Sequence, residues 1–220
     1  MGIEKNTVHA DEQISLKVKT VRNNGKKKVL FIGNSITRHE PKSDIGWFGD
    51  WGMAASCIDN DYVHVVLKFL EKKYGAVDYC IINIAEWESH YWQPEILSRF
   101  IDGKNFDADI VIFRAGENSW AAKDNFGKCD LEENYDKMVK FFTGEHAEKV
   151  ILTSLFWRES SIDKALKAVA EKNGFDYVDI GDLGGKDECK ALNEFKHAGV
   201  AMHPSDKGMK MIAERIIEKL

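Results

Sequence analysis

The chain has 220 residues, of which 44% are hydrophobic, and a net charge of −5. This length and composition fit one large domain with a sizeable core. The acidic balance argues against a nucleic-acid-binding protein, which usually presents a basic face. No apolar run approaches the ~18 residues that a membrane helix needs, so membrane insertion is not expected.

The N-terminus and the cysteines bear on the compartment. The first residues, MGIEKNTVHADEQ, show no signal peptide. We therefore expect a cytoplasmic protein if this N-terminus is native, and a secreted one if a signal peptide has been removed. The four cysteines are far apart and form no C-x-x-C pair, which favours free, partly buried thiols over a zinc site.

Strand-like and helix-like segments alternate along the chain. Residues 1–25 are expected to be an N-terminal extension or an edge strand, because ISLKVKTV alternates in polarity. Apolar, β-favouring runs then predict strands at 27–33, 77–85, 107–116, 149–157 and 175–181. Apolar spacing and capping residues predict helices at 61–75, 93–103, 131–144, 160–174 and 205–220. In the 160–174 helix, Ser160 or Ser161 is expected to cap the start.

This alternation predicts the fold class. Continuous apolar strands joined by helices imply a parallel sheet that is covered on both faces. We expect residues 26–220 to form one α/β domain, a three-layer α/β/α sandwich with a five-stranded parallel sheet of flavodoxin-like type.

The first predicted strand ends in Gly33-Asn34-Ser35, with a helix expected to begin at the serine. In parallel sheets, ligands bind beyond the C-terminal ends of the strands. Gly33 permits a sharp turn there. A serine at a helix N-terminus is either a cap or a nucleophile whose own N–H can bind a developing oxyanion.

Two later segments favour the nucleophile. The third strand ends in RAGENSW, which places Asn118 beside the first loop, and GVAMHPSDKGM places His203 just before the last helix. A serine, an asparagine and a histidine at these positions form a constellation rather than a lone match. The absence of G-x-S-x-G argues against the α/β-hydrolase elbow.

On these residues the chain resembles the SGNH hydrolase superfamily, the GDSL-like esterases and lipases. GNSIT matches the Ser block of that family, GENS the Asn block and HPSDKGM the His block, so that the match runs from about Val29 to the C-terminus. The resemblance implies ester hydrolysis without a metal or an organic cofactor. It also implies Ser35 as nucleophile and first oxyanion donor, His203 as general base, and Asn118 as an oxyanion donor through its side-chain amide.

Two positions depart from the family pattern. The family has an Asp three residues before the His, where this chain has Val200. A backbone carbonyl could hold the ring instead, giving a Ser–His dyad, or a carboxylate such as Glu117 or Glu88 could substitute. The family's glycine after the second strand is also missing. Glu88 falls near that position and would give its backbone N–H to the oxyanion hole, with Ala85 and Ser89 as alternatives.

His39 is a second histidine close to the serine in sequence. It lies four residues after Ser35, so that on a helix the two side chains would share a face. His39 could compete as the base, but we expect it to line the pocket or to pack, because a pair on one helix rarely aims the ring at the hydroxyl.

All six tryptophans follow the ends of predicted strands, on the rim that carries Ser35. They form either a hydrophobic lid over long loops or a surface for sugar rings and acyl chains. Asp50 and Arg114 could bind hydroxyl groups beside them. The expected substrate-binding residues are Trp47, Trp51, Asp50, Trp87, Trp120 and Trp157.

Together these features predict a serine esterase that hydrolyses small acyl esters, acetyl esters of carbohydrate above all, through a Ser-His dyad or a variant triad. Its partner would be a small-molecule or carbohydrate ester. The alternatives are a non-catalytic carbohydrate-binding protein of the same fold and an acyltransferase, which uses the same chemistry with another acceptor. A flavin- or nucleotide-binding module is disfavoured because no G-x-G-x-x-G or P-loop motif is present.

Overall fold

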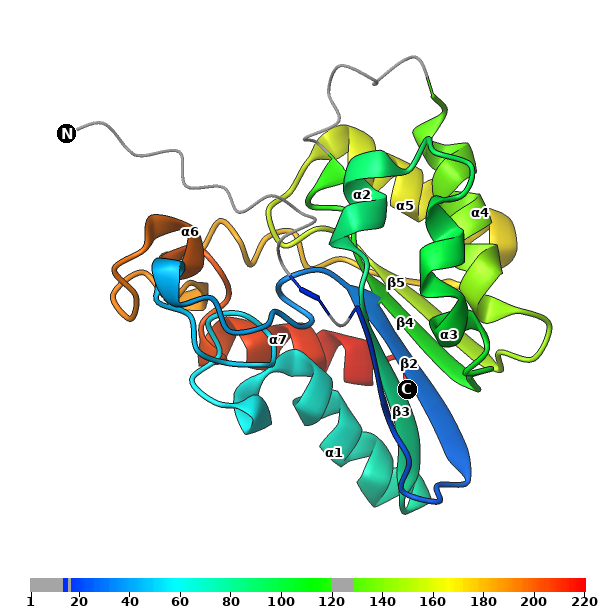
Figure 1. The fold of residues 1–220 in the computed structure, drawn as a ribbon, viewed down its shortest axis with the longest axis horizontal. Helices are drawn as coiled ribbons and strands as arrows, with labels where there is room; N and C mark the ends of the chain where they lie inside the picture. The colour runs from blue at the N-terminus through cyan, green and yellow to red at the C-terminus, as the bar shows by residue number, and fades with distance from the viewer. Residues whose placement is uncertain (1–13, 16, 120–128) are drawn as a thin grey trace.

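The computed structural model describes residues 14–15, 17–119 and 129–220 and has the expected three layers (Figure 1). In this described part, six strands form one sheet in the order β1-β3-β2-β4-β5-β6. Strands β2 to β6 run parallel as predicted, and β1 adds an antiparallel edge against β3. The strands are β1 (Val18–Val21), β2 (Lys27–Gly33), β3 (Val77–Asn83), β4 (Ile110–Arg114), β5 (Lys149–Thr153) and β6 (Asp176–Val178).

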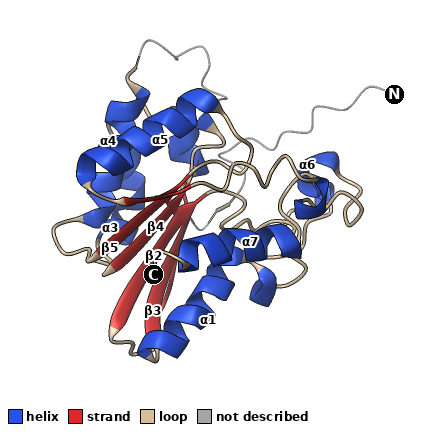
Figure 2. Ribbon diagram, turned by 180° about the vertical axis from the view of Figure 1, so that it is seen from behind, coloured by secondary structure: helices blue, strands red, loops and turns tan. Residues whose placement is uncertain are grey.

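Helices cover both faces of the sheet (Figures 1 and 2). Helices α1 and α7 lie on one face, and α3, α4 and α5 lie on the other. The helices are α1 (Tyr62–Tyr74), α2 (Ala85–His90), α3 (Ile101–Lys104), α4 (Leu131–Thr143), α5 (Ser160–Asn173), α6 (Ala198–Ala201) and α7 (Asp206–Ile217). The short 3₁₀ helices are η2 (Ser43–Ile45), η3 (Ile58–Asn60), η4 (Ile96–Phe100) and η6 (Asp187–Cys189). None of the helices described is long and apolar enough to cross a membrane.

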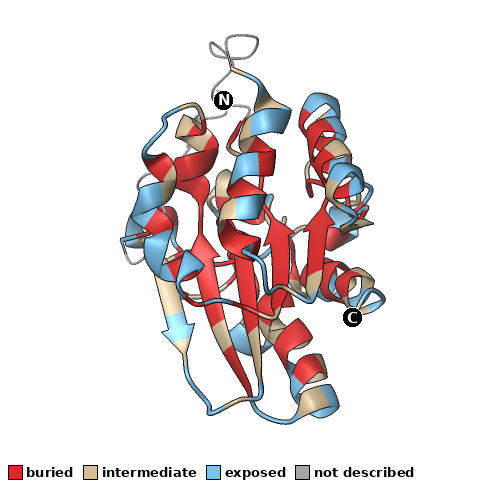
Figure 3. Cartoon of the chain, turned by 90° about the vertical axis from the view of Figure 1, so that its right-hand side faces the viewer, coloured by how far each residue is buried: buried red, intermediate tan, exposed pale blue. Residues whose placement is uncertain are grey.

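The side chains of β2 show how one strand supplies two cores. Leu30 and Ile32 pack with α4 and α5, whereas Val29 and Phe31 pack with α1 and α7, and all four are fully buried. This division follows from the two-residue period of a strand. Burying each such side chain contributes about 1.5–3 kcal/mol. The central strands are buried along most of their length, above all toward their C-terminal ends (Figure 3), so the loops that follow them emerge from a rigid base.

The turn after β2 differs from the prediction. Ser35 begins a turn rather than a helix, because Asn34 O accepts the N–H of Thr37 at 2.9 Å and the chain then leaves in an extended course. The next α-helix, α1, starts only after a long connection. A Cβ at Gly33 would lie 1.9 Å from Thr37 Oγ1, so this tight turn requires glycine.

Three helical segments also differ from the prediction. In place of the helix predicted at 93–103, the chain forms η4 and the short α3, with Gly103 inside α3 rather than after its end. Helix α2 was not predicted, because its six residues are too few to show a helical apolar period. Helix α5 is capped by Glu159, whose carboxylate accepts the Ser161 N–H at 2.9 Å, and not by Ser160 or Ser161.

Candidate active site

Ser35 and His203 lie together although 168 positions separate them in the chain. Ser35 stands in the turn after β2, and His203 in the loop between α6 and α7. The distance from Ser35 Oγ to His203 Nε2 is 2.8 Å. Within the described residues, the backbone N–H of Ser35 has no hydrogen-bond partner. The hydroxyl can therefore pass its proton directly to the imidazole, which is the chemistry of an activated nucleophile.

A backbone carbonyl holds the other side of the imidazole. His203 Nδ1 is 2.7 Å from Gly199 O, and because a carbonyl oxygen only accepts, Nδ1 donates its hydrogen there. Nε2 is then left as the acceptor that faces Ser35. Val200 occupies the place of the family's Asp, and neither Glu88 nor Glu117 replaces that carboxylate, because both are engaged elsewhere. A neutral carbonyl orients the ring but stabilises an imidazolium less than a carboxylate does.

The surroundings of His203 keep its ring neutral. Burial lowers the pKa of His203 to about 4; the hydrogen bond to Gly199 opposes this, and the nearby charges of His39 and Arg114 lower the pKa further. The Trp157 indole stands edge-on against the imidazole, with ring centroids 5.1 Å apart and planes at 84°. At neutral pH the imidazole is thus unprotonated, the state that a general base needs.

Next to the Ser35 turn, five polar side chains form what we call the Glu88 cluster: Asn34, Glu88, Arg114, Glu117 and Asn118. Arg114 donates to Glu117 at 2.5 and 3.0 Å and to Asn34 Oδ1. Asn34 Nδ2 donates to Glu117 Oε2 at 2.7 Å and to Glu88 Oε1 at 3.0 Å. Glu88 Oε2 accepts the backbone N–H of Asn118 at 3.1 Å and also its side-chain amide. One buried cation thus faces two buried carboxylates.

Sequence reasoning selected Glu88 but assigned it the wrong group. The backbone N–H of Glu88 donates to Ile84 O at 3.0 Å inside α2, so it cannot line an oxyanion hole. The N–H of Ala85, one of the alternatives, meets Asn83 Oδ1 at 3.0 Å. It is the carboxylate of Glu88 that reaches the site. Burial and the charge of Glu117 raise its pKa, against the N–H groups that donate to it. The only sequence signal for this carboxylate is its position, a glutamate within a few residues of the C-terminal end of a buried strand.

Two tryptophans that were expected to bind substrate are core residues. Trp87 is 1% exposed and packs edge-on against Tyr135, with ring centroids 5.0 Å apart. Trp47 is 2% exposed, and its Nε1 donates to His39 O at 3.2 Å. Indoles buried to this degree cannot stack on a sugar, so both predictions are wrong. Position after a strand places a residue near the rim but does not decide which way its side chain points.

The remaining predicted binding residues differ in their surroundings. Asp50 forms an ion pair with Arg38 at 2.7 Å, so a protein cation already satisfies this carboxylate. Trp51 is half-buried, and Trp157 is half-buried against His203. Trp120 lies outside the described residues.

His39 is buried close to the site but does not bind Ser35. Its Nδ1 donates to Glu40 O at 2.6 Å, and burial lowers its pKa. The Ser35 hydroxyl faces His203 instead. The ring of His39 therefore packs within the loop, in the manner expected from the sequence.

The comparisons with known proteins give matches to solved structures alone. No protein-family model and no curated protein matches the chain. A protein from Parabacteroides merdae described as a GDSL-like lipase has a TM-score of 0.58 at 16% identity, over 89% of this chain and 95% of that chain. The acetyl xylan esterase AlAXEase gives 0.53 at 18%, over 87% and 98%. The lipase Lip_vut3 from a goat rumen metagenome gives 0.51 at 14%, over 88% and 97%.

These matches span nearly the whole of each chain, and at such low sequence identities they show a shared fold. The predicted three-layer α/β/α arrangement is confirmed, with the antiparallel strand β1 added to it. The chain has the fold of the SGNH hydrolases, the GDSL-like lipases and esterases.

Proposed function

We propose that the protein is a serine esterase that hydrolyses small acyl esters, acetyl esters of carbohydrate above all, through a Ser35–His203 dyad. The observation that carries this proposal is the pair of bonds on the imidazole, 2.8 Å from Nε2 to Ser35 Oγ and 2.7 Å from Nδ1 to Gly199 O. The first bond gives the serine proton an acceptor, and the second fixes the tautomer that can accept it.

In the acylation half of the reaction, Ser35 Oγ attacks the ester carbonyl carbon while its proton moves to His203 Nε2. The tetrahedral intermediate then collapses, the bond to the alcohol breaks, and the leaving oxygen takes the proton from Nε2. In the second half, Nε2 accepts a proton from water, and the hydroxide attacks the acyl-serine. Collapse of that intermediate releases the acid, and Ser35 Oγ regains the proton.

The developing oxyanion needs donors that are already in place. We assign this role to the backbone N–H of Ser35 and to the side-chain amide of Asn118. Glu88 accepts from both the main chain and the side chain of Asn118, so that the amide is oriented from two sides. Removing one such donor costs about 10²–10³ in kcat in a comparable serine enzyme.

The carbohydrate assignment rests on two points. The half-buried indoles of Trp51 and Trp157 can offer an apolar face to a sugar ring, and Trp157 stands beside the proposed base. The similar structure AlAXEase is by its name an acetyl xylan esterase. We therefore expect higher kcat/KM for acetylated xylan oligomers than for p-nitrophenyl palmitate. Equal turnover of the two esters would contradict the assignment to small acetyl esters of sugars.

The dyad is tested with p-nitrophenyl acetate. Ser35→Ala and His203→Ala should each lower kcat by at least about 10³-fold, while circular dichroism and melting temperature stay near those of the wild type. Asp130→Ala is the matched control, because Asp130 caps α4 by accepting the Glu133 N–H at 2.9 Å. It should cost about 1 kcal/mol of stability and leave kcat unchanged.

The opposite pattern would contradict the proposal. A Ser35→Ala variant that turns over at the wild-type rate but unfolds more easily would mean that the serine serves only its turn. Loss of activity in Asp130→Ala would mean that the assay reports general stability rather than the dyad.

A further inference from the structure

The carboxylate of Glu88 joins three segments that carry the site. It is 0% exposed and accepts from the Asn34 amide at 3.0 and 3.3 Å, and from the backbone N–H of Asn118 at 3.1 Å. It also accepts from the backbone N–H of Gly116 and from the Asn118 amide. Glu88 itself belongs to α2 after β3, Asn34 to the turn after β2, and Gly116 and Asn118 to the loop after β4.

Stability alone is a poor reason for this arrangement. A buried carboxylate loses its hydration, and replacing buried ionic groups by well-packed apolar ones is often neutral or stabilising. Here the carboxylate also lies within the field of Glu117, a second buried carboxylate. The residues that Glu88 holds lie next to the proposed reacting groups, since Asn34 precedes Ser35 and Asn118 is the proposed oxyanion donor.

We propose that Glu88 is a positioning residue, whose ionised carboxylate holds the Asn118 amide and the Asn34–Ser35 turn in register for the oxyanion. This inference rests on the proposed esterase function and extends it. It assigns a positioning role to the side chain of Glu88, which stands near the position where the SGNH hydrolases have a glycine.

The number of N–H donors around Glu88 makes its role specific to a charged carboxylate. Four N–H groups converge on two oxygens that only accept. Glutamine has nearly the same shape but one oxygen and one donating NH₂, so at least one N–H would face another donor. A protonated Glu88 meets the same conflict, because one of its oxygens becomes a donor.

Protonation of Glu88 should therefore lower kcat. The groups that face it are Arg114 and Glu117 from the β4 side, Asn34 from the β2 side and the Tyr135 hydroxyl from α4. Burial and Glu117 raise the pKa of Glu88 above its usual 4.5. Because the pKa of His203 is lowered to about 4, the acidic loss of kcat should come from Glu88 first.

The test compares the wild type, Glu88→Gln and Asp78→Asn on p-nitrophenyl acetate from pH 4 to 8. Asp78 is the matched control, because this carboxylate also ties loop N–H groups, those of Asn23 at 2.8 Å and Gly25 at 2.9 Å, but at the other end of β3. We expect Glu88→Gln to lower kcat about 10²-fold, with KM within about threefold. We also expect this variant to lose the acidic limb, the fall of kcat that the wild type shows above pH 4.5 as Glu88 becomes protonated. Asp78→Asn should keep both kcat and the limb.

A second variant separates positioning from general support. In an Asn118→Ala background, Glu88→Gln should slow kcat far less than in the wild type, because the amide it positions is gone. A full, additive loss in the double variant would overturn the proposal. So would a Glu88→Gln enzyme with a lowered melting temperature but wild-type kcat and pH profile.

The remaining outcomes are also decisive. If Glu88→Gln fails to fold, the pH dependence of kcat in the wild type decides. A fall of kcat that begins above pH 4.5, with unchanged circular dichroism, supports the proposal. A kcat that stays constant until His203 becomes protonated overturns it. If Ser35→Ala keeps its activity, the esterase mechanism itself fails. If Ser35→Ala is inactive and Glu88→Gln is normal, only the role of Glu88 fails.

Discussion

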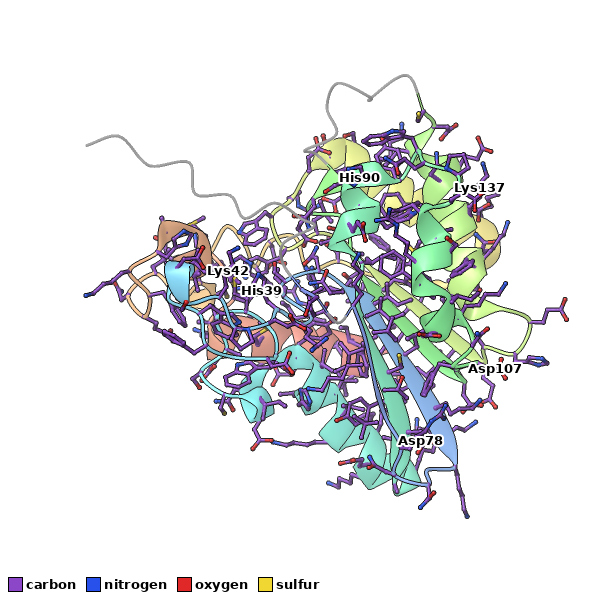
Figure 4. All side chains as sticks on the ribbon, viewed as in Figure 1. His39, Lys42, Asp78, His90, Asp107 and Lys137 are labelled. Atoms are coloured by element: carbon purple, nitrogen blue, oxygen red, sulfur yellow. The ribbon has the colours of Figure 1, made fainter. Side chains whose placement is uncertain are left out.

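Strand β3 has a buried carboxylate near each end, and the two differ in what surrounds them. Asp78, at its start, accepts two backbone N–H groups and pairs with Arg22 at 3.2 Å, a side chain that is 56% exposed. Glu88, just beyond its end, shares its surroundings with Glu117 and the fully buried Arg114. Figure 4 shows Asp78 at the opposite end of the sheet from His39, which follows the Ser35 turn.

The pKa shifts of Asp78 and Glu88 have opposite directions, which separates a carboxylate that stabilises the fold from one that we assign to the site. The N–H groups of Gly25 and Asn23 lower the pKa of Asp78, so its ionised form stabilises the fold. Burial and Glu117 raise the pKa of Glu88, so its ionised form costs stability. The Asp78 contribution is present above its unfolded pKa and is lost as pH falls, whereas the Glu88 contribution is present at low pH and is lost as pH rises. The fold tolerates an unfavourable charge at the end that carries Ser35 and His203.

The largest effect on stability should come from removing the cation of the Glu88 cluster. Arg114→Met leaves Glu88 and Glu117 buried with no positive charge between them. Breaking a buried pair in this way costs about 3–5 kcal/mol. Urea denaturation at pH 7 measures it, and the loss should shrink at acidic pH as the carboxylates become protonated. A loss below 1 kcal/mol would show that the cluster is not electrostatically coupled.

The second effect is a decrease in the free energy of unfolding at acidic pH, caused by protonation of His203. The unfolded chain binds a proton near the ordinary pKa of 6.5, but folded His203 only near 4, so stability falls as pH drops through this window. The full difference corresponds to about 3 kcal/mol, and solvent screening reduces it because His203 as a whole residue is half-buried. His39, whose pKa burial also lowers, acts in the same direction, and Glu88 acts in the opposite one.

Denaturation of His203→Ala between pH 7 and 4 measures this effect. The variant should lose less stability across the window than the wild type does. Asp78→Asn should change the profile only below about pH 4, because the pKa of Asp78 is lowered from 3.8. Identical slopes for His203→Ala and the wild type would mean that the imidazole titrates normally in the folded protein.

The parts of the molecule that the sequence predicted are those governed by local periodicity. The five parallel strands, the long helices and the edge strand follow from apolar spacing, which is fixed within ten or so residues. Ser35, Asn118 and His203 were found because each stands at a strand or helix end in a recognisable order. The sheet geometry then brings Ser35 and His203 within 2.8 Å.

What the sequence could not predict depends on long-range contacts. The carboxylate of Glu88 meets partners 28 to 54 positions away, and its burial exists only once three loops have assembled. The Gly199 carbonyl that orients His203 is a backbone group, so no residue type marks it. The buried indoles of Trp47 and Trp87 were misassigned because a loop position does not fix the direction of a side chain.

The smallest effect should come from repeating the Arg114 substitution at the other end of β3. Arg22→Met removes the Asp78 ion pair, but Asp78 keeps the N–H groups of Asn23 and Gly25, and water reaches the vacated side. The stem of the new side chain can still cover Phe106, over whose ring the Arg22 guanidinium lies at 4.7 Å. Ion pairs with an exposed cation contribute below about 1 kcal/mol, so urea denaturation should change by no more than that, with kcat unaffected. A loss as large as that of Arg114→Met would mean that the exposure of the partner cation does not distinguish the two carboxylates, and the comparison between the ends of the strand would fail.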